Sequence, residues 1–294
     1  MRNVFRTIAI VLMTLLVSGA LFAEGAQETQ EVEMTYVNWE EGVAWSHFFA
    51  ALLEDEMGYE VTLTAADVGP AYASVFGGDQ DFFMEAWLPN LHSTYVEGED
   101  YEEVSVIYED GVTGLIVPQY MADDGVTALS DLRDPEVAER LDYQITGIDA
   151  GAGMMIATEE ELMPGYGLGE MGYELVPSSS PAMLAAMESA IENEEYIVGM
   201  GWQSHSMFGR MDLAILEQDE ETVWSVDDIY VIGKPGVSDE LPEVVELFEN
   251  AMWTNATIGP LMVHIAESNL DTLEAAREWK DENPQVWEDW VPSN

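Results

Sequence analysis

The pattern of apolar and polar positions in the first third of the chain predicts strands that alternate with helices. Residues 34–39 (MTYVNW) and 59–65 have the composition of buried strands, and residues 42–57 between them carry apolar side chains at helical spacing. Residues 82–87 (FFMEAW) form another apolar run, which Pro89 ends. This β-α-β-α-β order is typical of a parallel sheet covered by helices.

A second series of strands and helices occupies the middle of the chain. It begins with an apolar run at 112–118 and continues to residue 202. The expected strands are 144–148, 173–176 and 196–202, and the expected helices are 154–162 and 181–193. A last strand at 229–232 leads into three helical patterns rich in tryptophan, which we expect to pack back on the first half.

Two such series in one chain predict an α/β fold of two lobes with a ligand cleft between them. We expect the first lobe to comprise residues 31–114 and 228–294, and the second lobe residues 115–227. The chain would then cross between the lobes near Gly114 and near Asp227. Lobes joined in this way can close on a ligand by a hinge motion.

Residues 1–23 differ from everything that follows them. Arg2 and Arg6 precede an apolar run at 8–16, small residues come next, and the first acidic residue is Glu24. This pattern is typical of a secretory signal peptide. An uncleaved membrane anchor is the alternative, and the apolar run is short for one.

Cleavage after Ala20 and cleavage after Ala23 both fit this pattern, and residues 24–30 would then form a polar linker to the fold. The chain contains no cysteine, so neither a disulfide framework nor a lipid-modified N-terminal Cys is available. We therefore expect a protein that is free in a periplasm or outside the cell.

The charge balance is unusual, because 58 acidic residues face 8 basic ones and give a formal charge of −50. Loss of Arg2 and Arg6 with the signal peptide would take the mature chain to −52. Self-repulsion of this size disfavours a compact state in dilute buffer, but at about 1 M salt the Debye length is only about 3 Å. We interpret the chain as an extracytoplasmic protein of a halophile, with an ordinary acidic protein as the alternative, and we exclude nucleic acid as a partner.

The segment 147–155 (GIDAGAGMM) places a glycine-rich turn between a strand and a helix. Its glycines, Gly151 and Gly153, would let the backbone N–H groups of Gly153 and Met154 point together at an anion. The third glycine of a dinucleotide fingerprint and the lysine of a phosphate loop are absent, which disfavours a nucleotide. A small carboxylate fits better, and a plain turn without a ligand is the alternative.

Three tryptophans, Trp39, Trp87 and Trp202, each end a predicted strand and precede polar or turn residues. A desolvated cation over an indole face gains about 2 kcal/mol, so three faces suit a cation that makes no directional hydrogen bonds. A quaternary ammonium group has this property. We interpret Trp45 and the C-terminal tryptophans as core residues, and Trp224 is undecided.

His92 has two interpretations, as a donor to a ligand carboxylate or as the cap of a helix at 90–96. The remaining histidines are isolated from one another and show no metal-ligand spacing: His47, His205 and His264. The run 178–180 (SSS) lacks the glycines of a hydrolase nucleophile and fits better as the cap of the helix that starts near Pro181. No pair of acidic residues stands out as acid and base, so we expect no catalytic residues and no metal site.

Seven segments, in their order along the chain, resemble the glycine betaine-binding proteins of ABC transporters, the OpuAC-like family: YVNW, GYEVTL, EAWLPNLH, GLIVPQYM, GIDAGAGMM, SSSPAMLAAM and GWQSHSMF. The resemblance extends over the chain from about residue 33. It implies a two-lobed periplasmic binding protein of type II with the ligand cleft between the lobes. It also implies a small-molecule ligand, a permease and its ATPase subunit as partners, and no cofactor.

In this family three tryptophans surround a trimethylammonium group, and the resemblance places them at Trp39, Trp87 and Trp202. A His after the AWLP segment and two adjacent amides of the glycine turn hold the ligand's carboxylate, here His92, Gly153 and Met154. The implied function is the capture of glycine betaine, or of a related compatible solute, for import and osmoprotection.

One segment departs from the family pattern. The last cage tryptophan is usually followed by Pro-His-Trp, whereas this chain reads Trp202-Gln-Ser-His-Ser206 and keeps only the His. Choline, carnitine, proline betaine and ectoine are the alternative ligands, and choline lacks the carboxylate that His92 would bind. Outside this class, a secreted hydrolase or a sensor subunit that presents the solute to a membrane receptor are the alternatives.

Overall fold

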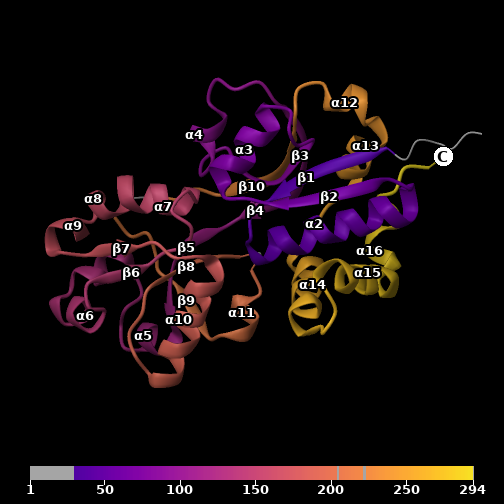
Figure 1. Ribbon diagram of the computed structural model, residues 1–294. Helices are drawn as coiled ribbons and strands as arrows, with labels where there is room; N and C mark the ends of the chain where they lie inside the picture. The colour runs from indigo at the N-terminus through magenta and orange to yellow at the C-terminus, as the bar shows by residue number, and fades with distance from the viewer. Residues whose placement is uncertain (1–29, 204, 221–222, 294) are drawn as a thin grey trace, which may run out of the picture.

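A computed structural model of the chain describes residues 30–203, 205–220 and 223–293. The predicted signal peptide and residues 24–29 of the predicted linker lie outside this part. Two lobes of mixed helices and strands lie side by side (Figure 1). No helix within the described ranges is long and apolar enough to cross a membrane.

The first lobe is built on a five-stranded sheet with the order β2-β1-β3-β10-β4. Strands β2, β1 and β3 run parallel, as the sequence predicts, whereas β10 is antiparallel to both of its neighbours, β3 and β4. The strands are β1 (Glu31–Tyr36), β2 (Glu60–Ala65), β3 (Phe82–Leu88), β4 (Glu102–Gly111) and β10 (Asp227–Gly233). Because all seven residues of β3 are buried, this strand lies in the centre of the lobe.

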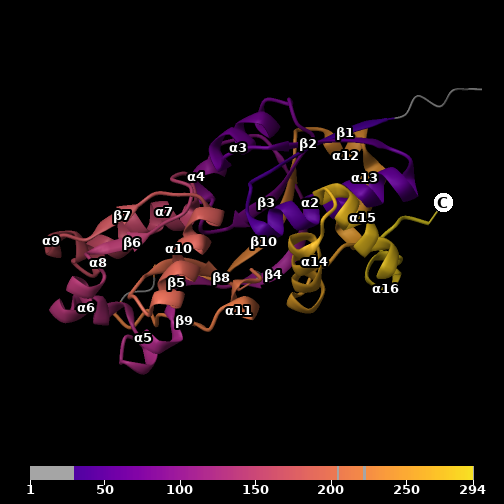
Figure 2. The ribbon, with the colours of Figure 1, turned by 60° about the horizontal axis from the view of Figure 1, so that its bottom comes forward.

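Helix α2 (Glu40–Leu52) packs on this sheet, and the C-terminal helices pack on α2 (Figure 2). The ring of Phe48 on α2 lies 4.9 Å from Trp253 and 5.7 Å from Trp279, measured between centroids. The predicted return of the C-terminal segment to the first lobe is therefore confirmed. The other helices of this lobe are α3 (Val68–Phe76), α4 (Ser93–Val96), α12 (Val237–Glu240), α13 (Pro242–Asn250), α14 (Asn255–Glu267), α15 (Thr272–Glu282) and α16 (Pro284–Trp287).

The second lobe contains two smaller sheets. Strand β5 (Thr113–Pro118) lies between β8 (Gly199–Trp202) and β9 (Leu213–Ile215) and is antiparallel to both, while β6 (Gln144–Thr146) and β7 (Glu174–Val176) form a parallel pair. The helices are α5 (Gln119–Asp123), η2 (Leu129–Arg133), α6 (Pro135–Arg140), α7 (Gly153–Ala157), η3 (Thr158–Leu162), α8 (Met163–Gly165), α9 (Leu168–Met171), α10 (Ser180–Asn193) and α11 (Met207–Arg210).

Several predicted elements differ in extent from the observed ones. Strands β4 and β9 were not predicted, and the strand expected at 196–202 begins only at Gly199. The helix expected at 42–57 starts earlier, at Glu40, and its last turn is a π-helix, η1 (Leu53–Met57). The chain leaves the first-lobe sheet after β4, enters the second lobe at β5 and returns to the first-lobe sheet in β10. The predicted lobe limits, 31–114 with 228–294 and 115–227, stay a prediction.

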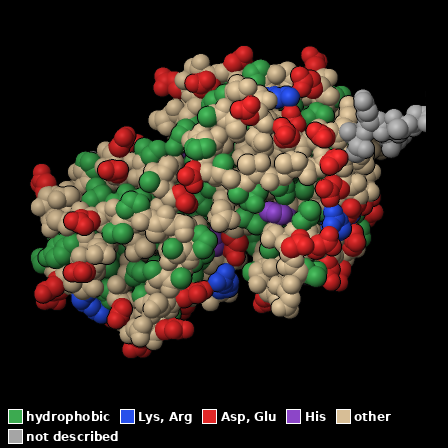
Figure 3. Space-filling view, viewed as in Figure 1, with side chains coloured by type: hydrophobic (Ala, Val, Ile, Leu, Met, Phe, Trp, Pro, Cys, Tyr) green, Lys and Arg blue, Asp and Glu red, His purple; other side chains and the backbone are tan. Residues whose placement is uncertain are grey.

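Acidic side chains are spread over the face of the molecule seen in Figure 3, with few basic ones among them. Each basic side chain of the described part is ion-paired with at least one acid. The residues are Arg133, Arg140, Arg210, Lys234, Arg277 and Lys280. Lys280 is 1% exposed and lies 2.9 Å from Asp55 and 2.8 Å from Glu56. The positive charges therefore join elements of the fold to one another, and most acids in the described ranges have no basic partner.

Candidate functional site

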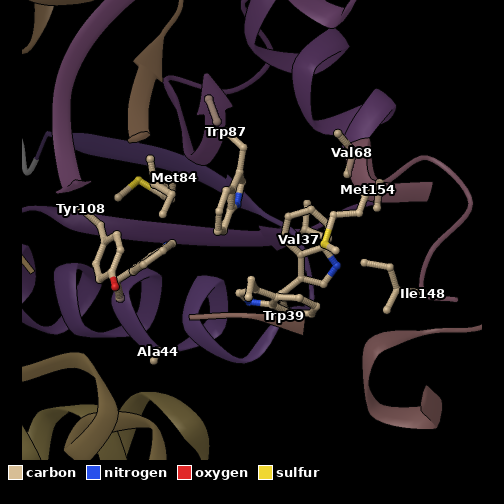
Figure 4. Close-up of a cluster of buried hydrophobic side chains, with 14 of the residues drawn as sticks. Val37, Trp39, Ala44, Val68, Met84, Trp87, Tyr108, Ile148 and Met154 are labelled. Carbon is tan, nitrogen blue, oxygen red and sulfur yellow. The ribbon is translucent and has the colours of Figure 1, made fainter. Parts of the chain in front are cut away.

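A small cavity between the two lobes contains all six residues predicted to bind a ligand. About 270 Å³ of space free of protein atoms lies within it, including the part open to solvent, so it suits a small metabolite. Trp39 and Trp87 of the first lobe lie near Met154 and Ile148 of the second (Figure 4). The cavity is lined by Trp39, Trp87, Leu91, His92, Thr113, Ile148, Ala152, Gly153, Met154 and Trp202.

The three tryptophans come from three different elements. Trp39 immediately precedes α2, Trp87 is the next-to-last residue of β3, and Trp202 is the last residue of β8. The ring centroids of Trp39 and Trp202 are 6.2 Å apart with an angle of 54° between the planes. Each side chain is at most 4% exposed. The structure therefore brings together the three indoles that the sequence singled out, from both lobes.

His92 also lies in this cavity, and its hydrogen bonds define which ring nitrogen carries the proton. The backbone N–H of Trp87 donates to Nδ1 at 3.1 Å, and the Tyr72 hydroxyl lies 3.1 Å from the same atom. Because Nδ1 accepts, the proton of the neutral ring is on Nε2. Burial lowers the pKa of His92 to about 3, so the ring is neutral near pH 7 and its Nε2–H is a donor.

The alternative role of His92 as a helix cap is wrong. His92 occupies the N-cap position of α4, yet its side chain makes no capping hydrogen bond. The loop that carries it is held instead by Asp227, which accepts from the backbone N–H of Asn90 at 2.6 Å and of Leu91 at 3.3 Å. Sequence reasoning missed Asp227, which lies far along the chain from this loop and at the predicted crossing between lobes.

The glycine turn lies opposite this loop. A Cβ on Gly153 would come within 2.3 Å of the Leu91 carbonyl oxygen, so only glycine allows the two lobes to approach this closely. Gly153 and Met154 are the first residues of α7, where backbone N–H groups have no acceptor within the helix. Neither N–H donates to another described residue. Both remain available to a ligand in the cavity that they line.

Hydrogen bonds and ion pairs join the lobes around the cavity. The Trp39 indole N–H donates to Asp149 Oδ2 at 3.2 Å, and the Tyr95 hydroxyl donates to the Gly151 carbonyl at 2.8 Å. At the start of α2, Glu40 accepts from Ser206 and lies 3.4 Å from Arg210 and 3.0 Å from His205 Nδ1. The histidine kept in the segment after Trp202 is thus part of an interlobe cluster.

The structure contains a buried acidic pair that sequence reasoning missed. Glu41, in the first turn of α2, and Glu85, in the middle of β3, are both 0% exposed and lie beside each other. A glutamate inside the apolar run FFMEAWL was the signal in the sequence. Neither carboxyl lines the cavity, so the pair lies behind its wall.

The remaining candidates lie outside the cavity. Within the described ranges, no group of acidic or histidine side chains could hold a metal ion. Ser179 accepts from the Ala182 N–H and caps α10, as predicted for the serine run. Trp45 is fully buried in the core of the first lobe, and Trp224 is 4% exposed and does not reach the cavity.

Together these features define a class of protein. Two α/β lobes that enclose a small cavity with walls from both lobes form a binding protein that closes on a small ligand. Residues 30–282 match the family described as the substrate binding domain of the ABC-type glycine betaine transport system. The chain belongs to this family, and the predicted two-lobed binding-protein fold is confirmed.

Relatives of known structure and sequence agree with this assignment. The glycine betaine/carnitine transport binding protein GbuC of Listeria monocytogenes is 31% identical over 156 residues, 53% of this chain and 51% of that protein, so the match spans about half of its length. Lactococcal OpuAC, in its closed-liganded conformation with glycine betaine, is 30% identical with a TM-score of 0.81, covering 90% of this chain and 100% of that chain. An ABC-transporter choline binding protein in complex with choline is 25% identical with a TM-score of 0.80, covering 88% of this chain and 91% of that chain.

Proposed function

We propose that this chain is the extracytoplasmic substrate-binding protein of an ABC importer and that its ligand is glycine betaine. The trimethylammonium group would lie among the indoles of Trp39, Trp87 and Trp202. The carboxylate would accept from His92 Nε2–H and from the backbone N–H groups of Gly153 and Met154. The observation that carries the proposal is that a single small cavity holds three indoles and these three donors.

The expected contacts are strong enough for such a site. Three cation–π contacts at about 2 kcal/mol each and three charge-assisted hydrogen bonds at about 1.5 to 3 kcal/mol each exceed the roughly 8 kcal/mol of a micromolar complex. The surplus offsets the ordering of the ligand and the closure of the lobes. Glycine betaine is also neutral overall, so a protein of net charge −50 does not repel it as it would repel a simple carboxylate.

Other solutes of the same class are second candidates. Carnitine, proline betaine and choline share the quaternary ammonium group, and the similar choline-binding protein supports choline as a possible ligand. Choline has no carboxylate, so it would leave the donors on His92 and Gly153 unused. Ectoine carries a positive charge that is delocalised over its ring, and a site for it would need fewer than three indole faces.

A secreted hydrolase has less support. The acidic pair Glu41 and Glu85 lies behind the cavity wall and does not line it, so neither carboxyl is placed to act on a ligand as an acid or a base. We therefore propose a binding protein without catalytic activity or cofactor. Its partners would be a permease and its ATPase subunit, and a sensor role would differ only in the identity of the membrane partner.

The test is titration calorimetry of the mature protein with glycine betaine, choline and ectoine, at low and high salt. We expect micromolar or tighter binding of glycine betaine and weaker binding of the other two. His92→Ala should weaken glycine betaine by about tenfold or more, because a charge-assisted hydrogen bond is lost, and should change choline little. Absence of glycine betaine binding under all conditions, in a protein that is folded by circular dichroism, would refute the proposal.

A further inference from the structure

Two buried acidic side chains lie behind the tryptophan wall and make none of the proposed ligand contacts. Glu41 is the second residue of α2, directly after the segment that carries Trp39, and Glu85 lies on β3 two residues before Trp87. Residues two apart on a strand face the same side of the sheet, so Glu85 and Trp87 share one face. A buried acid without a basic partner is costly, and this chain keeps two of them next to its ligand site.

The packing leaves room for this pair. A Cβ on Gly42 would lie 2.0 Å from Glu85 Oε2, so a glycine is required in α2 beside the carboxyl. Within the described part of the chain, neither carboxyl makes a hydrogen bond of standard geometry, and the same holds for the indole N–H groups of Trp87 and Trp202. Each indole N–H nevertheless lies close enough to favour the ionised form of one carboxyl. The N–H of Trp202 favours ionised Glu41, and the N–H of Trp87 favours ionised Glu85.

Both carboxyls of the pair are protonated below about pH 7, and one proton remains above it. Burial raises the pKa of Glu41 to about 7, although its own backbone N–H, Glu85 and Trp202 favour the charged form. Burial and the charge on Glu41 raise the pKa of Glu85 well above its usual range. Glu85 is therefore the protonated partner, and the negative charge that appears above about pH 7 belongs to Glu41.

The other titratable groups around the pair do not neutralise this charge. Glu40, the neighbouring residue of α2, is acidic and raises the pKa of Glu41 further. Tyr108 on β4 and Tyr72 on α3 also interact electrostatically with the pair, and the pKa values of both phenols are raised, chiefly by burial, so they stay uncharged. An ionised Glu41 thus has no counter-charge among these neighbours, and a cation in the tryptophan cage would supply one.

We propose that the Glu41–Glu85 pair is the charge-selectivity element of the ligand site: an ionised Glu41 behind the indoles favours a cationic headgroup over an uncharged headgroup of the same shape. The proposal rests on the betaine site proposed above. The indole faces alone attract a cation through their quadrupole, and they also accept an uncharged tert-butyl group as an apolar surface. A buried negative charge adds an attraction that acts on the cation alone, because the surrounding low-dielectric interior screens it weakly.

The test compares two ligands that differ by one atom. Glycine betaine and 3,3-dimethylbutanoate have the same shape and carry the same carboxylate, and only the first carries the positive nitrogen. Calorimetry at about pH 6 and about pH 8.5 keeps both carboxylates ionised. The ratio of the Kd of 3,3-dimethylbutanoate to that of glycine betaine isolates the preference for positive charge, because closure of the lobes contributes to both.

We expect this ratio in the wild-type protein to fall by about fivefold from pH 8.5 to pH 6, as the charge on Glu41 is lost. Glu41→Gln keeps the shape of the side chain and should lower the ratio at pH 8.5 toward its value at pH 6, because burial still raises the pKa of the remaining Glu85. Glu85→Gln leaves one titrating carboxyl and should keep a pH-dependent ratio, whereas the double variant should show a low ratio at both pH values. Glu60→Gln, on the exposed side of β2, is the matched control and should behave as wild type.

The outcomes separate this proposal from the function on which it rests. Absence of glycine betaine binding would refute the betaine site itself. Binding of glycine betaine with the same ratio at both pH values, or a wild-type ratio in the double variant at pH 8.5, would refute only the role of the acidic pair. Melting temperatures of the variants show that they are folded, so a reduced ratio then reports selectivity, because unfolding would weaken both ligands equally.

Discussion

The indole N–H of Trp39, on the first lobe, donates a hydrogen bond to Asp149 Oδ2, on the second lobe, at 3.2 Å. Trp39 is therefore held by the opposite side of the cleft as well as by its own lobe. The contact fixes one wall of the proposed cage only when the lobes are together. It links the orientation of an aromatic wall to lobe closure.

Replacement of Asp149 should weaken ligand binding through this link. Asp149→Ala removes a charged acceptor, which is worth about 1.5 to 3 kcal/mol, so we expect the Kd for glycine betaine to rise by about tenfold or more. Asp149→Asn keeps an acceptor for the indole N–H and should lose less affinity for glycine betaine. Calorimetry measures both, and equal affinities in wild type and Asp149→Ala would show that the contact does not contribute to closure.

Gly153→Ala should block the approach of the lobes. The added Cβ would lie 2.3 Å from the Leu91 carbonyl oxygen, which belongs to the loop that carries His92. We expect a loss of glycine betaine affinity of at least tenfold, with a melting temperature of the ligand-free protein close to that of wild type. Gly169→Ala is the matched control, because a Cβ there meets no atom within 4 Å. Wild-type affinity in Gly153→Ala would contradict the close approach.

His205 should make the ligand-free protein sensitive to acid. Burial lowers the pKa of His205 to about 4 despite the neighbouring Glu40, so the folded state holds it neutral while the unfolded state takes up a proton below about pH 6.5. The stability that this group contributes is complete above about pH 6.5 and is lost as the pH falls toward 4. At pH 5 the loss amounts to about 2 kcal/mol.

His205→Gln cannot take up this proton and should lose less stability than wild type between pH 7 and pH 5. Comparison of the two proteins at each pH cancels the effect of acid on the many surface carboxylates. The measurement is the melting temperature. Between pH 7 and pH 5 we expect it to fall by about 5 °C more in the wild-type protein than in His205→Gln. Parallel pH profiles for the two proteins would contradict a depressed pKa at His205.

The charge of the chain predicts a strong dependence of stability on salt. The basic side chains of the described part are already paired, so added salt mainly screens repulsion among unpaired acids. We expect the melting temperature to rise between about 0.05 M and about 2 M NaCl, where the Debye length drops below about 3 Å. A melting temperature that is flat or falls with salt would argue against the halophilic interpretation.

The candidate ligand-binding tryptophans could be predicted from their places relative to the predicted strands. Trp87 and Trp202 lie at the ends of strands, whereas Trp39 lies beyond β1, which ends at Tyr36 and not at the predicted residue 39. The strand pattern nevertheless singled out all three tryptophans, and the resemblance to known binding proteins linked them with His92. Strand β3 could also be predicted from the sequence, because all of its residues are buried.

Contacts between distant segments could not be predicted in this way. Asp227 reaches the His92 loop because β10 pairs with β3 in the first-lobe sheet, whereas the cluster of Glu40 with His205 depends on how the two lobes meet. No local pattern encodes either contact. Strand β4 was missed because its charged residues (EEVSVIYEDG) hide the alternation of a strand that pairs with β10. Glu85 was read as part of an apolar run, although an acid in that position demands an explanation.

A crystal structure of the mature protein with glycine betaine would test the proposed ligand site most directly. We expect the quaternary nitrogen to lie within about 6 Å of the centroids of the indoles of Trp39, Trp87 and Trp202. We also expect the carboxylate to lie within hydrogen-bond distance of His92 Nε2 and of the backbone nitrogens of Gly153 and Met154. A ligand that lies outside this cavity, or that turns its carboxylate toward Trp39, Trp87 and Trp202, would contradict the proposed site.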